Sequence, residues 1–390
     1  MRMIWAVAVA ASLAGISSAR ADWRLVTSDL KETPKVTVNE FSLPDGLSVT
    51  QESGELKHAS ARDVVSLMSS ADKKDATGGW VLTLRNGDIL SGTPGDATEN
   101  GVTFTVAELG DIEVPLKNVL TLGLAGKAGS GGGAKISATT RDVVRLANGD
   151  SIEGDFTSIK DGKVAVHTDA GDVAMELAKV ERIAIAGVVP NRSVPPLSLR
   201  VTLASGSVLT THALNWRVND VTLKDPAGKE RKTTPDAILG IEILGGRAVS
   251  LLELDPAKDE QVPYMGAKWA TQINANVLGQ PLKMGKQTYA RGLGVHTKST
   301  LMWELDGSFE TLFVRAGVDD SSLPYGEANL SVVLDGKVLW EKKGVKAGDA
   351  AETLELPIAN GRRLELRADR GARLDVQGRV DWANPVVTRK

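Results

Sequence analysis

Two stretches of this chain read almost alike: Leu82-Thr-Leu-Arg-Asn-Gly-Asp-Ile-Leu-Ser-Gly92 and Val144-Arg-Leu-Ala-Asn-Gly-Asp-Ser-Ile-Glu-Gly154. In both, apolar residues alternate with polar residues on either side of an Asn-Gly pair. Alternation with a period of two is typical of half-buried β-strands, and Asn-Gly favours the tight turn of a β-hairpin. Each stretch therefore predicts two antiparallel strands that are joined by a short turn.

The likeness between the two stretches extends over a longer internal repeat. Residues 80–124 align with residues 142–185 at an offset of 62 that falls to 61, and a weaker third copy fits residues 199–243. Four or five short strands in roughly 45 residues would form a small, strongly bent sheet, and the pattern is similar to that of SH3-like and Sm-like barrels. Residues 22–75 also alternate like β-structure, and one short helix is expected at residues 62–69.

The N-terminus carries the features of an export signal. Arg2 is followed by an apolar stretch, Ile4 to Ile16, and then by the small-x-small sequence Ala19-Arg-Ala21. This pattern predicts a signal peptide that is cleaved before Asp22, and its apolar stretch is too short to span a bilayer. We therefore expect an exported protein, periplasmic or extracellular, with no membrane span.

The composition of the chain excludes several classes of function. The 390 residues include no cysteine, which rules out disulfides, thiolate metal sites and cysteine nucleophiles. Lysine and arginine number 46 against 49 acidic residues, for a net charge of −3, so a nucleic-acid partner is not expected. The chain also lacks the Gly-x-Ser-x-Gly and His-Glu-x-x-His motifs of common hydrolases.

Two linkers divide the repeats. Residues 126–134 are rich in glycine, as in a flexible tether, and Pro190 to Pro196 is a stiffer boundary before the third copy. The predicted division is a signal peptide at 1–21, an N-terminal β-rich segment at 22–75, β repeats at 78–125, 139–188 and 197–247, a glycine-rich linker at 126–138, and a C-terminal module at 251–390.

Aromatic residues gather in this C-terminal module. It contains all three tyrosines and four of the tryptophans, namely Tyr264, Tyr289, Tyr325, Trp269, Trp303, Trp340 and Trp382. Short apolar segments recur along it, and Asp335-Gly336 joins two of them as a hairpin turn. Many short antiparallel strands indicate a two-sheet sandwich of jelly-roll type. The flat, partly polar rings of tyrosine and tryptophan suit either a sandwich core or a surface that stacks on sugars.

Several runs within the module resemble a known family. Residues 289–299 read Tyr-Ala-Arg-Gly-Leu-Gly-Val-His-Thr-Lys-Ser, and residues 316–320 read Ala-Gly-Val-Asp-Asp. Together with Gly279-Gln-Pro-Leu282, Leu334-Asp-Gly-Lys-Val-Leu-Trp340 and Asp381-Trp-Ala-Asn-Pro385, they resemble the NPCBM family. The resemblance spans residues 262–390. It implies a galactose-binding-like jelly roll, similar to carbohydrate-binding module family 51, that binds galactose-containing glycans and can hold a structural calcium ion.

Two positions depart from the family pattern. The family usually has lysine where this chain has Arg291. It also favours an acidic, histidine-containing run where this chain has Gln377-Gly-Arg-Val380. The second departure removes the groups that such a run would offer to a ligand or an ion.

Six residues of the module are candidates for a carbohydrate site, because they combine aromatic faces with polar groups near loops. They are Tyr289, His296, Asp319, Asp320, Tyr325 and Trp382. Structural interpretations stay open beside this one: a buried imidazole for His296, a polar turn for Asp319-Asp320 and a core ring for Trp382. Tyr325 lies in the loop-like run Ser-Ser-Leu-Pro-Tyr-Gly, where no core requires an aromatic residue.

The sequence therefore predicts an exported, non-catalytic carbohydrate-binding protein whose glycan partner binds the C-terminal module. A structural or scaffolding envelope protein, using the module for protein contacts, is one alternative. A glycoside hydrolase with an unrecognised site is another. Asp319 and Asp320 do not by themselves supply the two carboxylates of a hydrolase, because neighbours on a strand face opposite sides. No catalytic residue and no metal ligand is assigned.

Overall fold

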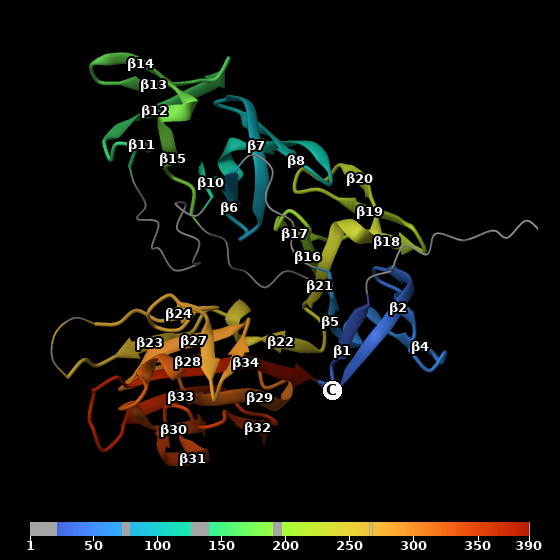
Figure 1. Ribbon diagram of the computed structural model, residues 1–390, viewed down its shortest axis with the longest axis vertical. Coiled ribbons are helices and arrows are strands. Elements are labelled where there is room, and N and C mark those ends of the chain that lie inside the picture. The colour runs from blue at the N-terminus through green and yellow to red at the C-terminus, as the bar shows by residue number, and fades with distance from the viewer. Residues whose placement is uncertain are drawn as a thin grey trace, which may run out of the picture.

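The computed structural model describes residues 22–71, 79–125, 140–189, 197–264, 266 and 268–389 (Figure 1). The predicted signal peptide at 1–21 and the linkers predicted at 126–138 and 190–196 lie outside the described residues. The mainly β class is confirmed, since the described ranges form strands and short 3-10 turns without any α-helix.

Four successive units share one plan, with a 3-10 turn directly before the last strand of each. The first unit (22–71) contains β1 (Trp23–Thr27), β2 (Glu32–Ser42), β3 (Gly46–Thr50), β4 (Leu56–Ala59), η1 (Ala61–Asp63) and β5 (Val64–Ser69). The second unit (79–125) contains β6 (Trp80–Leu84), β7 (Ile89–Thr98), β8 (Gly101–Val106), β9 (Gly110–Pro115), η2 (Leu116–Asn118) and β10 (Val119–Leu124).

The third unit follows the same order, and in the fourth unit two strands, β17 and β18, take the place of the long second strand. The third unit (140–189) contains β11 (Asp142–Leu146), β12 (Ser151–Lys160), β13 (Lys163–Thr168), β14 (Gly171–Glu176), η3 (Leu177–Lys179) and β15 (Val180–Ala184). The fourth unit (197–247) contains β16 (Ser198–Leu203), β17 (Val208–Thr211), β18 (Leu214–Arg217), β19 (Asp220–Lys224), β20 (Glu230–Thr233), η4 (Pro235–Ala237) and β21 (Ile238–Leu244). The likeness of these units to SH3-like or Sm-like barrels stays a prediction.

The two Asn-Gly pairs occupy the same place in their units. Asn86-Gly87 connects β6 to β7, and Asn148-Gly149 connects β11 to β12. In each turn the asparagine Oδ1 accepts the backbone N–H of the following aspartate at 3.1 Å. The glycines have φ of 88° and 97°, a conformation that glycine adopts without strain. The alignment of the repeats predicts this equivalence.

The first unit repeats the plan of the others without an Asn-Gly-Asp motif. The short helix predicted at residues 62–69 is wrong, because Val64–Ser69 form strand β5. In β5, Leu67 pairs with Leu25 of β1 on one side and with Ile241 of β21 on the other. Pairing along both edges with strands distant in the sequence outweighs the local preference of these residues.

The order of the four units in space differs from their order along the chain. The last strands of the second and third units pair with each other, with Leu122 opposite Ile183, and those of the first and fourth units pair through Leu67 and Ile241. The second and fourth units meet where Ile89 of β7 pairs with Val208 of β17. The spatial order is therefore third, second, fourth, first, as the colours in Figure 1 show.

The C-terminal module (residues 248–389) is a sandwich of two sheets. One sheet has the order β24-β27-β34-β29-β32, with β22 also paired to β34, and the other has the order β23-β28-β33-β30-β31. The elements are β22 (Ala248–Ser250), η5 (Leu251–Glu253), β23 (Lys258–Gln261), β24 (Gln272–Ile273), β25 (Leu282–Met284), β26 (Gln287–Tyr289), β27 (Gly292–His296), β28 (Ser299–Glu304), β29 (Phe309–Val318), η6 (Asp320–Ser322), β30 (Glu327–Leu334), β31 (Lys337–Lys346), β32 (Glu352–Pro357), β33 (Arg363–Arg370) and β34 (Arg379–Arg389).

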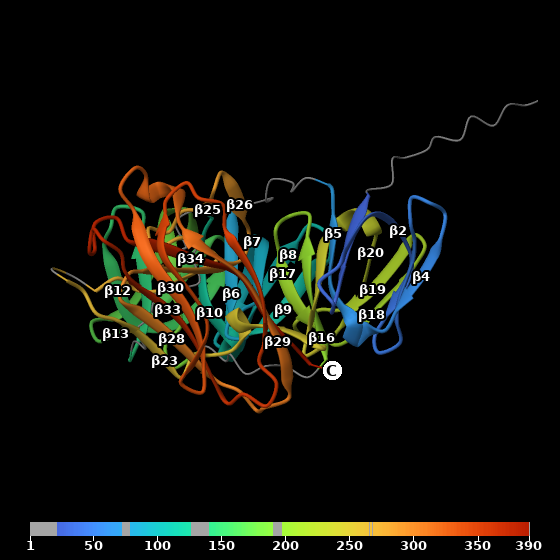
Figure 2. The same cartoon turned by 90° about the horizontal axis from the view of Figure 1, so that it is seen from below.

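The core of the module lies between the two sheets, where Trp303 and Trp382 are fully buried. The predicted hairpin turn at Asp335-Gly336 is confirmed, since it joins β30 to β31. Seen from below, the module lies in front of the second and third units, with the first unit to one side (Figure 2).

A cluster of charged side chains joins the module to the fourth unit. Arg200 of β16 contacts Glu242 of β21 at 3.6 Å and Glu253 of η5 at 3.2 Å. Arg291 of the module contacts the same two carboxylates, reaching Glu253 at 3.3 Å. Burial raises the pKa of Glu253, and the two guanidinium groups act against this rise. Arg291, one of the two departures from the family pattern, thus lies at the contact between the module and the repeats.

Candidate functional site

Two of the six predicted site residues lie inside the module. The ring of Trp382 is fully buried in the core between the sheets. Tyr289 is 7% exposed, packs against Leu282 and Met284, and donates its hydroxyl to Gln287 Oε1 at 3.2 Å. Neither ring has a free face in this structure, so neither is placed to stack on a sugar.

Asp319 and Asp320 hold the loop and hairpin of residues 276–286 against the end of β29. Asp319 accepts hydrogen bonds from Asn276 Nδ2 and the backbone N–H of Lys283, both at 3.0 Å. Asp320 accepts the backbone N–H groups of Gly285 at 3.0 Å and Lys286 at 2.8 Å. Both carboxylates therefore act as anchors for backbone amides.

The acidic turn is occupied by protein donors. Both oxygens of Asp319 and both oxygens of Asp320 accept N–H groups, so part of their capacity to coordinate an ion is already used. In the described part of the chain, no three His, Asp or Glu side chains are grouped so as to hold a metal ion.

A second buried acid lies next to Asp319. Asp381 is fully buried, and burial, together with the adjacent Asp319 carboxylate, raises its pKa to about 10. Burial also acts to raise the pKa of Asp319, but hydrogen bonds from Asp381, Ser321 and Lys283 outweigh it and hold that pKa below its usual value. The two pKa values shift in opposite directions, as expected for two adjacent buried carboxyl groups that share one proton.

Glycines explain how Asp381 comes to be covered on the outer face of its sheet. Asp381 of β34 pairs with Gly294 of β27 on one side and with Gly317 of β29 on the other. A Cβ on Gly294 would lie 2.4 Å from the carbonyl oxygen of Ala275, and a Cβ on Gly317 would lie 2.9 Å from Met284 Sδ. The missing side chains let residues 275–284 pack directly onto the sheet.

His296 is buried beneath an exposed tryptophan. The imidazole is 6% exposed, and its ring centroid lies 5.3 Å from that of Trp269, with the planes inclined by only 10°. Trp269 itself is 40% exposed, and its backbone N–H donates to Gln261 Oε1 at 3.1 Å. Burial lowers the pKa of His296, so the imidazole is neutral at pH 7 and presents one donor and one acceptor.

Asp375 ties the neighbouring loops together. It accepts hydrogen bonds from the Thr297 hydroxyl at 3.0 Å, from Arg370 Nε at 2.7 Å and from the backbone N–H of Tyr264 at 2.7 Å. Burial acts to raise the pKa of Asp375, and these hydrogen bonds outweigh it and lower the pKa. The loop that carries Tyr264 and Trp269 is therefore fastened to the end of β27.

Tyr325 lies exposed on an adjacent loop, as the sequence predicts. Its side chain is 52% exposed, and the guanidinium carbon of Arg373 lies 5.0 Å from its ring centroid. The loop of Tyr325 and the loop of Arg373 are in contact, since a Cβ on Gly326 would meet the carbonyl oxygen of Gln377 at 2.8 Å.

Three loops thus meet at one end of the sandwich, which we call the loop end. Its described residues are 262–264, 266, 268–271, 319–326 and 371–378. Its exposed apolar side chains are Val262, Tyr264, Trp269, Leu323, Tyr325, Leu374 and Val376. The structure brings His296 and Tyr325 to this end, and it leaves Tyr289 and Trp382 inside the module. The candidates from sequence did not include Trp269. Pro263 and Gly266 mark its run as a loop, just as proline and glycine mark the run of Tyr325, so the same signal could have indicated it.

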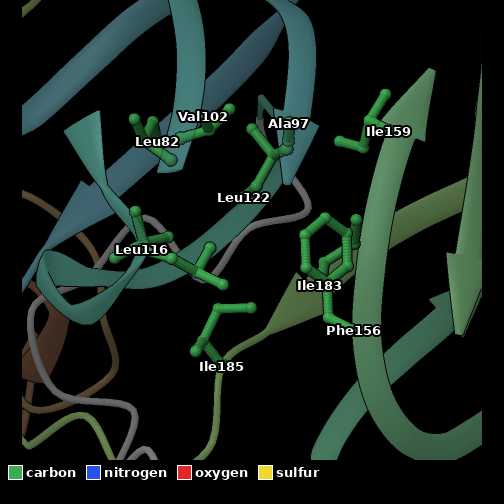
Figure 3. A pocket seen from close by; sticks show the side chains of 10 residues that line it. Leu82, Ala97, Val102, Leu116, Leu122, Phe156, Ile159, Ile183 and Ile185 are labelled. Carbon is green, nitrogen blue, oxygen red and sulfur yellow. The ribbon is translucent and has the colours of Figure 1, made fainter. Parts of the chain in front are cut away.

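A pocket between the second and third units differs in character from the loop end. It is lined entirely by apolar side chains, among them Leu122, Phe156 and Ile183 (Figure 3). These residues belong to the strands through which the two units pair. The pocket is therefore an imperfection in the packing of two repeats and offers no polar group to fix a ligand.

Within the described ranges, no helix is long and apolar enough to cross a membrane.

A family model and two curated relatives match this chain. The model of the NPCBM/NEW2 domain matches residues 249–388. The "Putative endo-alpha-N-acetylgalactosaminidase" of Renibacterium salmoninarum is 26% identical over 70% of this chain and 18% of its own length. The "Alpha-1,3-galactosidase B" of Akkermansia muciniphila is 30% identical over 26% of this chain and 13% of its own length. The chain thus spans less than a fifth of the length of either relative.

Among solved structures, one similar chain is CBM51 from Clostridium perfringens GH95 in complex with methyl-galactose. It is 20% identical, covers 36% of this chain and 99% of its own, and has a TM-score of 0.33. The tandem CBM51 modules of Sp3GH98 from Streptococcus pneumoniae are 12% identical, covering 64% of this chain and 88% of their own, also with a TM-score of 0.33. The C-terminal third of this chain, residues 249–388, is an NPCBM domain.

Proposed function

We propose that this protein binds a glycan at the loop end of its C-terminal module and does not break a bond in it. The observation that carries this proposal is the Trp269 ring, which lies parallel to His296 and is 40% exposed. A ring held on one face by a buried partner offers its other face to a ligand at little cost in side-chain entropy.

The groups around Trp269 have the chemistry that a sugar needs. An apolar sugar face lies on an aromatic ring, and the surrounding hydroxyls pair with donors and acceptors. The hydroxyls of Tyr325 and Tyr264, which are two further exposed rings of the loop end, supply both roles, and the buried His296 holds the Trp269 ring in place. The NPCBM match and the names of the two curated relatives support a carbohydrate as the ligand class.

The carboxylates of the loop end support binding without turnover. Glycoside hydrolysis uses two carboxyl groups that face the scissile bond. Four carboxylates here, those of Asp319, Asp320, Glu327 and Asp375, each accept at least one backbone N–H. They serve to hold the loops in place.

The proposal also covers the rest of the chain: residues 1–21 export the protein, and the four units act as a rigid spacer that carries the module.

A scaffolding role is the second candidate, and one observation favours it. The charged cluster of Arg200, Glu242, Glu253 and Arg291 fixes the module to the repeats, which is more than a tethered binding module requires. In that case the loop end would bind a protein surface. A glycan panel distinguishes the two, because a protein ligand would leave every glycan unbound.

The test is titration calorimetry of residues 22–390 with a panel of galactosides, for the wild type, W269A and a control variant. Val338 is a suitable control, because it is 53% exposed on β31 and V338A also shortens an exposed apolar side chain. We expect W269A to weaken binding by about tenfold or more, and V338A to bind like the wild type. Equal binding by W269A, with its fold intact by circular dichroism, would overturn the site. Hydrolysis of any panel member would favour a hydrolase.

A further inference from the structure

Among the cationic side chains beside the loop end, two are neutralised by carboxylates. Lys298 contacts Asp369 at 2.7 Å, and Arg370 contacts Asp375 at 2.7 Å. Arg373 and Arg379 have no carboxylate within ion-pair distance among the residues that the structure describes. Arg373 and Arg379 are therefore two cations of this end that no carboxylate pairs directly, while the carboxylates of Asp319, Asp320 and Glu327 are bonded to backbone N–H groups.

These two arginines contact the same turn. Arg379 Nη1 donates to the carbonyl oxygen of Ser321 at 2.6 Å. Arg373 lies over the ring of Tyr325, four residues further along that turn. Both guanidinium groups thus lie beside the loop that carries Tyr325.

The strand register places Arg379 beside the stacked pair. Arg379 of β34 is the direct antiparallel partner of His296 of β27. Directly opposed residues of neighbouring strands project their side chains to the same face of the sheet. Arg379, His296 and the Trp269 ring stacked on it therefore belong to one surface. The charge of Arg379 also acts, after burial, to lower the pKa of His296, which places the two groups within electrostatic range of each other.

We propose that the loop end binds an acidic saccharide, with a carboxylate or sulfate group against Arg379 and Arg373 and a sugar ring on Trp269. A guanidinium has five N–H donors in a planar fork, and Arg379 donates one of them to Ser321, so others remain for a ligand. Carboxylate and sulfate oxygens match that fork in pairs. This inference rests on the proposed function and specifies the ligand of the same site.

The experiment compares three ligands that share a lactose core: lactose, 3′-sialyllactose and lactose sulfated at O3 of galactose. Binding to residues 22–390 is measured by titration calorimetry at low and high salt. The variants are R379Q, R373Q and the double variant. The control is K337Q, which removes one positive charge at the β30–β31 hairpin, at the opposite end of β30 from the loop end.

We expect at least one acidic ligand to bind about five- to tenfold more tightly than lactose at low salt, with the advantage shrinking at high salt. The double variant should lose this advantage and keep its affinity for lactose, and K337Q should behave as the wild type. The better of the two acidic ligands identifies the group that the arginines take.

Two outcomes overturn the inference and leave the proposed function standing: equal binding of lactose and both acidic ligands, or weaker binding of the acidic ligands. Binding of an acidic ligand that R373Q and R379Q leave unchanged also overturns it. If none of the three ligands binds, nor any member of the galactoside panel, the proposed function fails together with the inference.

Discussion

The Asp88 carboxylate of the second unit accepts the backbone N–H of Thr210 in the fourth unit at 2.9 Å. A reciprocal hydrogen bond joins the same two units. Ser207 follows the turn glycine of the fourth unit, just as Asp88 follows the turn glycine of the second unit. The Ser207 hydroxyl oxygen accepts the backbone N–H of Ser91 at 2.9 Å. Asp88 and Ser207 occupy equivalent positions after their turns, and so do Ser91 and Thr210. The repeats thus associate through equivalent residues, although the contact lies within one chain.

The first prediction tests this contact through its counterpart in the third unit. Asp150 follows the same Asn-Gly turn as Asp88 but is exposed, whereas Asp88 is 1% exposed. We expect D88A to lower the free energy of unfolding by about 1–3 kcal/mol, because it leaves a buried N–H without an acceptor. The matched variant D150A should change it by less than about 0.5 kcal/mol. Urea unfolding measures both, and equal effects would contradict the role of Asp88.

The second prediction concerns the pH dependence caused by Asp381. Its pKa is about 10 in the folded protein against an ordinary value of 3.8, so the folded state binds the proton more tightly than the unfolded state does. The contribution of this group to stability is therefore fully present below pH 3.8 and is lost as the pH rises toward 10.

The measurement for Asp381 is urea unfolding between pH 5 and pH 9 for the wild type and D381N. An asparagine keeps the shape and donates to Asp319 without a charge that has to be neutralised. We expect D381N to reduce the loss of stability with rising pH and to be more stable than the wild type at pH 9. Parallel curves for the two proteins would show that Asp381 does not titrate in this range.

The third prediction concerns Arg291, which joins the module to the repeats. In R291A the carboxylates of Glu242 and Glu253 lose one of their two cationic partners at a partly buried contact. We expect the free energy of unfolding to fall by about 1–3 kcal/mol. Arg217 and Glu40 form an exposed pair, so R217A is the control and should cost less than about 1 kcal/mol. Calorimetry that shows no difference between the two variants would contradict a structural role for Arg291.

The fourth prediction concerns where an independent module begins. The boundary predicted from sequence, residue 251, removes strand β22, whose Val249 pairs with Val387 and is buried. A fragment of residues 248–390 should therefore unfold cooperatively, and a fragment of residues 251–390 should be less stable by about 2 kcal/mol or more, from the lost burial of Val249. Thermal unfolding of both fragments checks this. Identical midpoints would show that β22 contributes nothing.

Short-range patterns predicted much of the fold. The alternation around Asn86-Gly87 and Asn148-Gly149 indicated hairpins, and Asp335-Gly336 indicated another, because the turn residues and the period of two act between neighbours in the chain. The same reasoning failed at residues 62–69. There the strand is decided by partners about forty residues before it and 170 residues after it, Leu25 and Ile241.

The site shows the same division between local and tertiary causes. The sequence alone predicted a β-rich chain with repeated units and a loop that exposes Tyr325, since these follow from composition, spacing and turn chemistry, and its motifs showed the resemblance of the C-terminal module to the NPCBM family. Only the tertiary structure decided that Trp382 is core, that Asp319 and Asp320 hold a hairpin, and that Trp269 covers His296. The physical reason is that burial and hydrogen-bond partners depend on which strands become neighbours, and that choice is made by contacts between residues far apart in the chain.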